Sequence, residues 1–176
     1  MSIRAVVFDL DGTLADTLPD IARTMDGCLA RLGLPGHDLA AYRSFVGHGV
    51  VALVQRVLPP GRPDLVADLV ATYRQAYEAE CCAAARPYPG VTALLAALRA
   101  RGLPLAVLSN KPDGATHRVV DHLFAPGTFA HVLGQAEGAP LKPDPTTLLA
   151  QYQETGFPER GGPIPGKYLF YGSCFL

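Results

Sequence analysis

The stretch IRAVVFDLDGTLADT, residues 3–17, decides the fold class of this chain. Its first six residues, 3–8, are mostly apolar, which is typical of a short strand buried on both faces. Two carboxylates, Asp9 and Asp11, follow at once and lead into a glycine-containing segment. Like charges this close resist joint ionisation, so they lower stability unless a cation or a reaction uses them. The stretch therefore predicts a buried strand that carries two acidic groups at its carboxyl end.

Downstream, four helical segments follow without an intervening strand. The spacing of apolar residues predicts them at 19–32, 38–45, 50–58 and 64–84. Four consecutive helices cannot belong to the sheet that residues 3–8 begin, so we expect an inserted helical cap, residues 15–86. The segment PYPG, residues 87–90, is the expected return linker, because two prolines and a glycine disfavour both a helix and a central strand.

Beyond residue 90 helices and strands alternate. We expect helices at 91–101, 113–123 and 146–155, and strands at 104–109, 131–134 and 168–171. Such alternation predicts a parallel sheet with right-handed crossovers, whose ligands bind at the carboxyl ends of the strands. The expected fold class is therefore α/β, with a Rossmann-like core made of residues 1–14 and 87–176 and a helical cap inserted into it.

Composition narrows the classes of function. The chain has 176 residues, 49% hydrophobic and 18% charged, which is ordinary for a globular protein. A formal net charge of −1, with no long run of either sign, argues against a nucleic-acid surface. Apolar runs are too short for a membrane helix, and the N-terminus does not read as a targeting signal. We expect a cytoplasmic protein with reduced cysteines, a small-molecule partner and a monomeric or homodimeric state.

The run Asp-x-Asp-Gly-Thr-Leu-x-Asp-Thr at residues 9–17 resembles the first motif of haloacid dehalogenase-like (HAD-like) phosphatases. A bare Asp-x-Asp would more readily be read as two loop carboxylates that cap backbone amides, whereas the full run is specific. The resemblance implies that Asp9 is a nucleophile that forms an aspartyl-phosphate and that Asp11 is the general acid/base. It also implies that Gly12 and Thr13 bind substrate. Asp11 argues against a dehalogenase, which has no leaving alkoxide to protonate.

Two later segments resemble further motifs of the same family. SNKP, residues 109–112, follows a predicted strand; alone it would be read as a turn or helix cap. By the resemblance, Ser109 and Asn110 hold phosphate oxygens. KPDP, residues 142–145, resembles the third motif, in which Lys142 neutralises the charge that develops on the aspartyl-phosphate.

The segment FVGHGV, residues 45–50, lies between two predicted cap helices. Alone it would be a glycine-rich helix connection, but together with SNKP it resembles phosphoglycolate phosphatases, in which His48 would bind substrate. The carboxylate of such a substrate would need Arg43, Arg56 or Lys111. Pyrophosphate and sugar phosphates, including isomerisation of a sugar phosphate, remain alternatives for the small phosphorylated partner.

The resemblance fails near the end of the chain. The family carries a further strand that ends in an acidic motif, usually Gly-Asp, which supplies carboxylates to Mg²⁺. Here the last residues are YLFYGSCFL, 168–176, and no Asp or Glu follows Glu159. Mg²⁺ would then be held by Asp9 and Asp11 alone among the motif residues. We expect a chain truncated before or within the fourth motif, lacking the last core strand and helix, and either an impaired enzyme or a noncatalytic phosphate-binding remnant.

Overall fold

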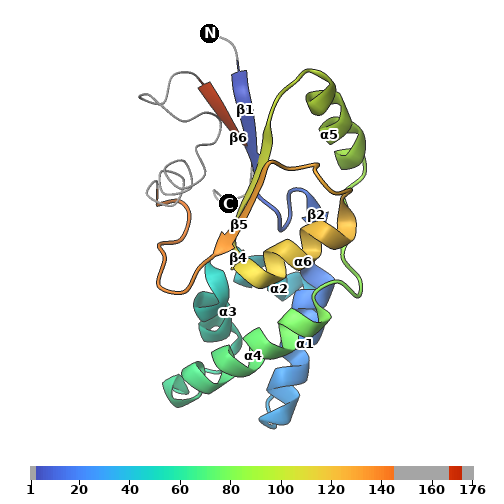
Figure 1. Ribbon diagram of the computed structural model, residues 1–176. Coiled ribbons are helices and arrows are strands. Elements are labelled where there is room, and N and C mark those ends of the chain that lie inside the picture. Colours follow the sequence, from blue (N-terminus) through green and yellow to red (C-terminus); the bar gives the residue numbers. More distant parts are fainter. Residues whose placement is uncertain (1–2, 145–166, 172–176) are drawn as a thin grey trace.

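The computed structural model describes residues 3–144 and 167–171 (Figure 1). The predicted helix at 146–155 lies outside the described residues. None of the described helices has the length and apolar character needed to cross a membrane.

A four-stranded parallel sheet forms the centre of the described chain. Its strands are β1 (Ile3–Phe8), β4 (Leu105–Pro112), β5 (His131–Gln135) and β6 (Lys167–Tyr171), in the order β5-β4-β1-β6. This confirms the predicted α/β class with a parallel sheet. Because β1 pairs on both sides, its last four residues are 2% exposed or less, as the apolar run indicated.

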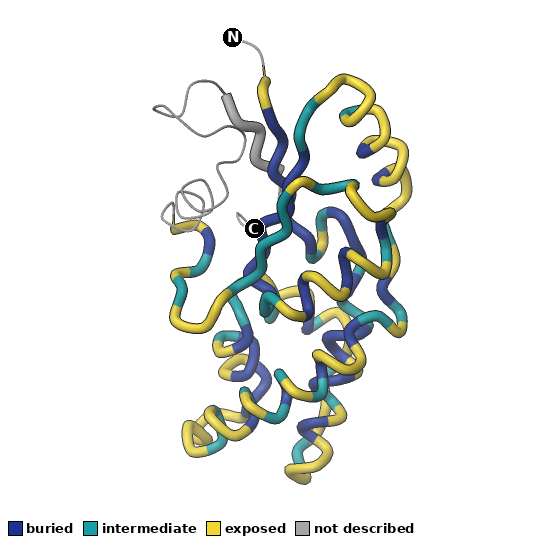
Figure 2. The backbone as a smooth tube through the Cα atoms, in the orientation of Figure 1, coloured by how far each residue is buried: buried dark blue, intermediate teal, exposed yellow. Residues whose placement is uncertain are grey.

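Six α-helices accompany these strands within the described residues. Helices α1 (Leu18–Arg31), α2 (Leu39–Phe45), α3 (Gly49–Val57) and α4 (Val66–Glu80) lie together below the sheet in Figure 1, with a short 3-10 turn at Pro63–Leu65 before α4. The other two are α5 (Val91–Ala100) and α6 (Asp113–Leu123). One buried apolar cluster runs from the sheet into α1–α4, and Figure 2 shows that the buried residues follow β1, β4 and one side of these helices.

A short antiparallel ribbon, which the sequence did not predict, forms where the chain passes from β1 to α1 and from α4 to α5. It pairs β2 (Ala15–Asp16) with β3 (Arg86–Pro87), and Tyr88 extends it by donating its N–H to the carbonyl of Leu14 at 3.1 Å. The segment that leads into helices α1–α4 is therefore hydrogen-bonded to the segment that follows them. These segments coincide with the predicted ends of the cap, residues 15–86, and the division into core and cap stays a prediction.

Strand β4 continues to Pro112, three residues beyond the predicted end at Ser109. The apolar run stops at Leu108, but the next three residues, Ser109–Lys111, are also buried. Backbone pairing with β5 resumes at Pro112 after an irregularity. Hydrophobic patterning missed this extension because polar side chains line the end of the strand.

Helix α4 ends at Glu80, four residues before its predicted end at Ala84, and Asp20 explains why. The Asp20 side chain on α1 is fully buried and accepts the backbone N–H groups of Ala84 at 2.9 Å and Ala85 at 2.8 Å. These N–H groups are therefore satisfied without a helical partner. Asp20 also pairs with Arg23 at 2.7 Å. This carboxylate joins α1 to the segment that returns to the sheet.

We expect Asp20→Ala to lower the free energy of unfolding by about 3 kcal/mol, because it leaves two buried N–H groups without their acceptor. Asp20→Asn should lose less, since an amide oxygen still accepts. Urea denaturation measures both. Asp121→Asn, a change at an exposed position on α6, is the matched control and should stay within about 0.5 kcal/mol of the wild type. A loss for Asp20→Ala no larger than for this control would contradict the role given to Asp20.

Candidate active site

Asp9 lies at the carboxyl end of β1 and is paired with Lys142, 133 residues further along the chain. The Nζ atom of Lys142 is 2.7 Å from Oδ1 of Asp9, and the backbone N–H of Leu10 donates to the same oxygen at 2.8 Å. Both side chains are buried, with Asp9 7% and Lys142 6% exposed. Both contacts use Oδ1, so neither of them engages the second oxygen, Oδ2.

Burial and the charge of Lys142 have opposite effects on the pKa of Asp9. Burial has the largest effect and raises the pKa of Asp9 above its ordinary value, while the charge and hydrogen bond of Lys142 lower it. The nearby charge of Asp11 raises it further. Lys142 therefore favours the ionised carboxylate that a nucleophile needs.

The backbone around Lys142 is held against β4 by Asn110. The Asn110 side chain accepts the N–H of Lys142 at 2.8 Å and donates to its carbonyl at 3.0 Å. The second amide hydrogen goes to the carbonyl of Gly47, at 2.9 Å, in the loop between α2 and α3. Lys142 Nζ also donates to the carbonyl of Leu108 at 2.7 Å. Asn110 thus connects β4, Lys142 and the helical region, and its predicted contact with substrate stays a prediction.

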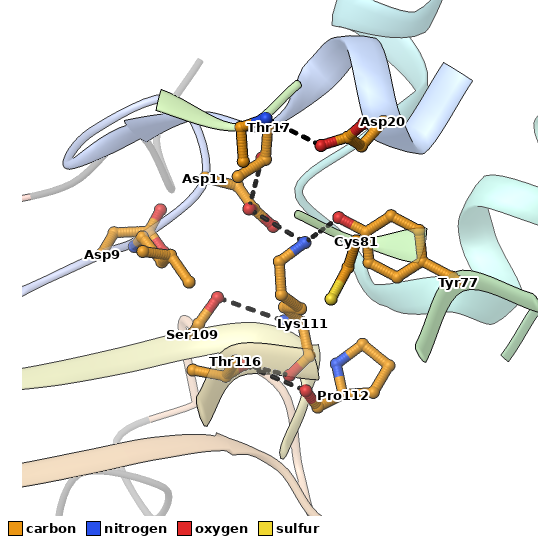
Figure 3. Close-up of polar contacts among 12 residues, drawn as sticks. Asp9, Asp11, Thr17, Asp20, Tyr77, Cys81, Ser109, Lys111, Pro112 and Thr116 are labelled. Atoms are coloured by element: carbon orange, nitrogen blue, oxygen red, sulfur yellow. Dashed lines mark hydrogen bonds and ion pairs between the residues drawn. The ribbon is translucent and has the colours of Figure 1, made fainter. Parts of the chain in front are cut away.

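Asp11 lies in the turn after β1 and is half-buried. Its Oδ1 accepts a hydrogen bond from the Thr17 hydroxyl at 2.6 Å and lies 3.0 Å from Nζ of Lys111 (Figure 3). The turn depends on Gly12, whose φ of 75° lies in the left-handed region that favours glycine, and Thr13 closes it by donating its N–H to the carbonyl of Leu10 at 3.2 Å.

Ser109 is brought to the same end of the sheet, because β4 pairs in parallel with β1. Its side chain is buried, and its Oγ accepts the N–H of Lys111 at 3.2 Å. The structure therefore gathers Asp9, Asp11, Ser109 and Lys142 at the carboxyl ends of two neighbouring strands, as a site at this edge requires. Their chemical roles stay predictions.

His48, in contrast, is exposed at the start of α3. Its Nδ1 is 3.2 Å from Nη1 of Arg56, and Arg56 also donates to the carbonyls of Ser44 and Phe45 at the end of α2. This arginine is thus occupied in connecting two helices. The substrate-binding role of His48 stays a prediction.

Two residues of this region were not among the predicted site residues. Thr17 belonged to the first motif but had no assigned role, and Tyr77, on α4, has the helical spacing of a core residue. The Tyr77 hydroxyl accepts a hydrogen bond from Nζ of Lys111 at 2.7 Å. Only the fold brings Tyr77 on α4 to Lys111 on β4, so no local signal could have identified Tyr77.

A family model described as haloacid dehalogenase-like hydrolase matches residues 3–174. The chain belongs to this family. Among curated proteins it is 36% identical over 175 residues to a phosphoglycolate phosphatase of Pseudomonas putida, covering 96% of this chain and 62% of that protein. It is 37% identical over 161 residues to a phosphoglycolate phosphatase of Rhodospirillum rubrum, covering 87% and 67%. The chain thus spans about two thirds of the length of these relatives.

Solved structures of related proteins have the same fold as this chain. A predicted phosphoglycolate phosphatase from Haemophilus somnus 129pt superposes with a TM-score of 0.81 at 27% identity, over 97% of this chain and 77% of that one. A haloacid dehalogenase-like family protein from Streptococcus pneumoniae superposes with a TM-score of 0.79 at 25% identity, over 96% and 74%. The parallel sheet with its inserted helices is therefore the architecture shared with these HAD-like proteins.

Among the residues that the structure describes, the site offers few ligands for a metal ion. Within residues 3–144 and 167–171 no group of three or more His, Cys, Asp or Glu side chains could hold one. Asp9 and Asp11 nevertheless provide the hard oxygen donors that Mg²⁺ prefers. Oδ1 of each is already engaged with a lysine, so a magnesium ion beside these two residues would take most of its ligands from water and substrate.

We expect Lys142→Met to raise the pKa of Asp9 further above its present value, because the positive charge that favours the ionised form is removed. Carboxyl ¹³C NMR during a pH titration measures this change. Lys111→Met is the matched control, since its ammonium contacts Asp11, and it should move the Asp9 midpoint less. An Asp9 midpoint that does not rise in Lys142→Met would contradict the pairing.

Proposed function

We propose that this chain is a magnesium-dependent phosphomonoester hydrolase that forms an aspartyl-phosphate on Asp9, with 2-phosphoglycolate as its substrate. The observation that carries the proposal is the buried pair of Asp9 and Lys142, 2.7 Å apart at the end of β1. A carboxylate held in a dry site beside a fixed cation suits attack on phosphorus, because the cation stabilises the charge that develops there.

The reaction would proceed in two steps. In the first, Oδ2 of Asp9 bonds to phosphorus, the ester P–O bond breaks, and Asp11 gives a proton to the leaving oxygen. In the second, Asp11 takes a proton from water, and the water oxygen bonds to phosphorus while the bond between phosphorus and Oδ2 breaks. Inorganic phosphate leaves and the Asp9 carboxylate is restored. Ser109 would hold a phosphate oxygen, with Gly12 and Thr13 alongside.

Magnesium would be held by the Asp9 carboxylate and the backbone carbonyl of Asp11. The ion would supply positive charge that reduces the repulsion between the anionic nucleophile and the incoming phosphate. With so few protein ligands among the described residues, we expect weak binding that strengthens when phosphate is present.

The cation for the substrate's carboxylate is best supplied by Arg43. Arg56 is engaged with the end of α2, and Lys111 is engaged with Asp11 and Tyr77. Arg43 is the remaining candidate, and it is exposed on α2.

The proposal is tested by phosphate release from 2-phosphoglycolate, with and without Mg²⁺. We expect release by the wild type that requires the metal, and at least about a thousandfold loss in Asp9→Asn, because an amide cannot form the intermediate. Asp121→Asn serves as the matched carboxylate control and should retain activity. Equal release by Asp9→Asn, or none by the wild type with Mg²⁺, would overturn the proposal.

The substrate assignment has its own test. Arg43→Gln should raise KM for 2-phosphoglycolate by about tenfold to a hundredfold, the effect of losing a charge-assisted hydrogen bond. It should leave ethyl phosphate, which has no carboxylate, nearly unchanged. Arg99→Gln, at an exposed position on α5, is the control. Equal effects of Arg43→Gln on both substrates would exclude this role for Arg43.

A further inference from the structure

Lys111 is a buried cation for which the proposed reaction has no step. The residue is 5% exposed, and a buried ammonium is unfavourable unless it is paired. Its Nζ is 3.0 Å from Oδ1 of Asp11 and 2.7 Å from the Tyr77 hydroxyl, and it lies 4.5 Å from the centre of the Tyr77 ring. Figure 3 shows the ammonium between these two side chains. Lys111 therefore connects α4 to the turn that carries Asp11.

The Tyr77 side chain is fixed in position by burial and by stacking. It is buried and stacks on Tyr73 of the same helix, with ring centres 5.2 Å apart and planes 13° apart. Burial raises the pKa of Tyr77 well above that of an ordinary phenol, so the hydroxyl stays neutral and its oxygen accepts the Lys111 hydrogen bond. The position of the ammonium is thus set from the helical region as well as from β4.

On the other side, the contacts distinguish the two oxygens of Asp11. Oδ1 receives the Lys111 ammonium and also the Thr17 hydroxyl at 2.6 Å. An oxygen that already accepts two hydrogen bonds is a poor place for an added proton, so the proton that Asp11 carries as an acid belongs on Oδ2.

We propose that Lys111 is a positioning residue for proton transfer, which, held by Tyr77, binds Oδ1 of Asp11 and leaves Oδ2 to face the leaving oxygen. This inference rests on the proposed function, because it assigns a role within the same reaction. Lys111 touches neither substrate nor phosphate in this role and acts only through Asp11.

Such a role predicts a dependence on the leaving group. An alkoxide must be protonated as it leaves, so the first step with 2-phosphoglycolate needs a correctly placed Asp11 proton. A nitrophenolate leaves without a proton, so the first step with 4-nitrophenyl phosphate does not. Loss of Lys111 or of the Tyr77 hydroxyl should therefore slow the first substrate much more than the second.

The test measures single-turnover phosphorylation rates for Lys111→Met and Tyr77→Phe with both substrates. With 2-phosphoglycolate we expect a loss of about a hundredfold for Lys111→Met and about tenfold for Tyr77→Phe, with KM nearly unchanged, in the range of general acid catalysis. With 4-nitrophenyl phosphate the loss should stay below about threefold. Tyr73→Phe, which removes a buried hydroxyl from the neighbouring ring of the stack, is the matched control and should change neither rate.

Two kinetic results would overturn the inference. Equal losses with both substrates would mean general damage to the site, and a raised KM for 2-phosphoglycolate alone would mean that Lys111 binds the substrate's carboxylate.

A structural measurement separates this inference from the proposed function. In crystals of Lys111→Met, the Asp11 carboxylate should change orientation while Asp9 and Lys142 remain paired. An unchanged Asp11 would reject the positioning role even if the wild type hydrolyses neither substrate, a result that by itself would reject the proposed function.

Discussion

The structure depends on one requirement, which is that the charge of Asp9, buried at the end of β1, must be compensated. Lys142 compensates it from 133 residues away, and Asn110 fixes the backbone of Lys142 on β4. A buried carboxylate without such a partner would be neutral or strongly destabilising. The same contacts that stabilise this charge also place a carboxylate, a cation and the end of β4 at one edge of the sheet.

Much of this fold follows from the sequence because its elements have strong local signals. The apolar run at Ile3–Phe8 and the helix at Asp113–Leu123 have the predicted bounds. The predicted bounds are wrong where buried polar groups, rather than the local apolar pattern, determine where an element ends. Helix α4 ends early because Asp20 accepts the N–H groups of Ala84 and Ala85. Strand β4 continues through Ser109, whose polar side chain is buried. Such long-range partners leave no periodic pattern in the sequence.

In the candidate site, too, some residues could be predicted from local motifs and others depend on long-range contacts. The motifs identified Asp9, Asp11 and Lys142, and the sheet brings them together. They gave no indication that Lys111 reaches Tyr77, because a tyrosine on the apolar face of a helix looks the same whether it fills the core or receives a cation. The sequence likewise does not indicate which oxygen of Asp11 contacts Lys111, because this depends on the three-dimensional structure.

The ribbon of β2 and β3 has a consequence for how such proteins diversify. Since the outgoing and returning segments are hydrogen-bonded neighbours, at Ala15–Asp16 and Arg86–Pro87, the two covalent connections between helices α1–α4 and the sheet lie side by side. An insertion whose ends already touch can be lengthened, shortened or exchanged with little disturbance to the rest of the domain. Helices α1–α4 can thus vary among related proteins while β1 and β4, with Asp9 and Ser109 at their carboxyl ends, stay in place.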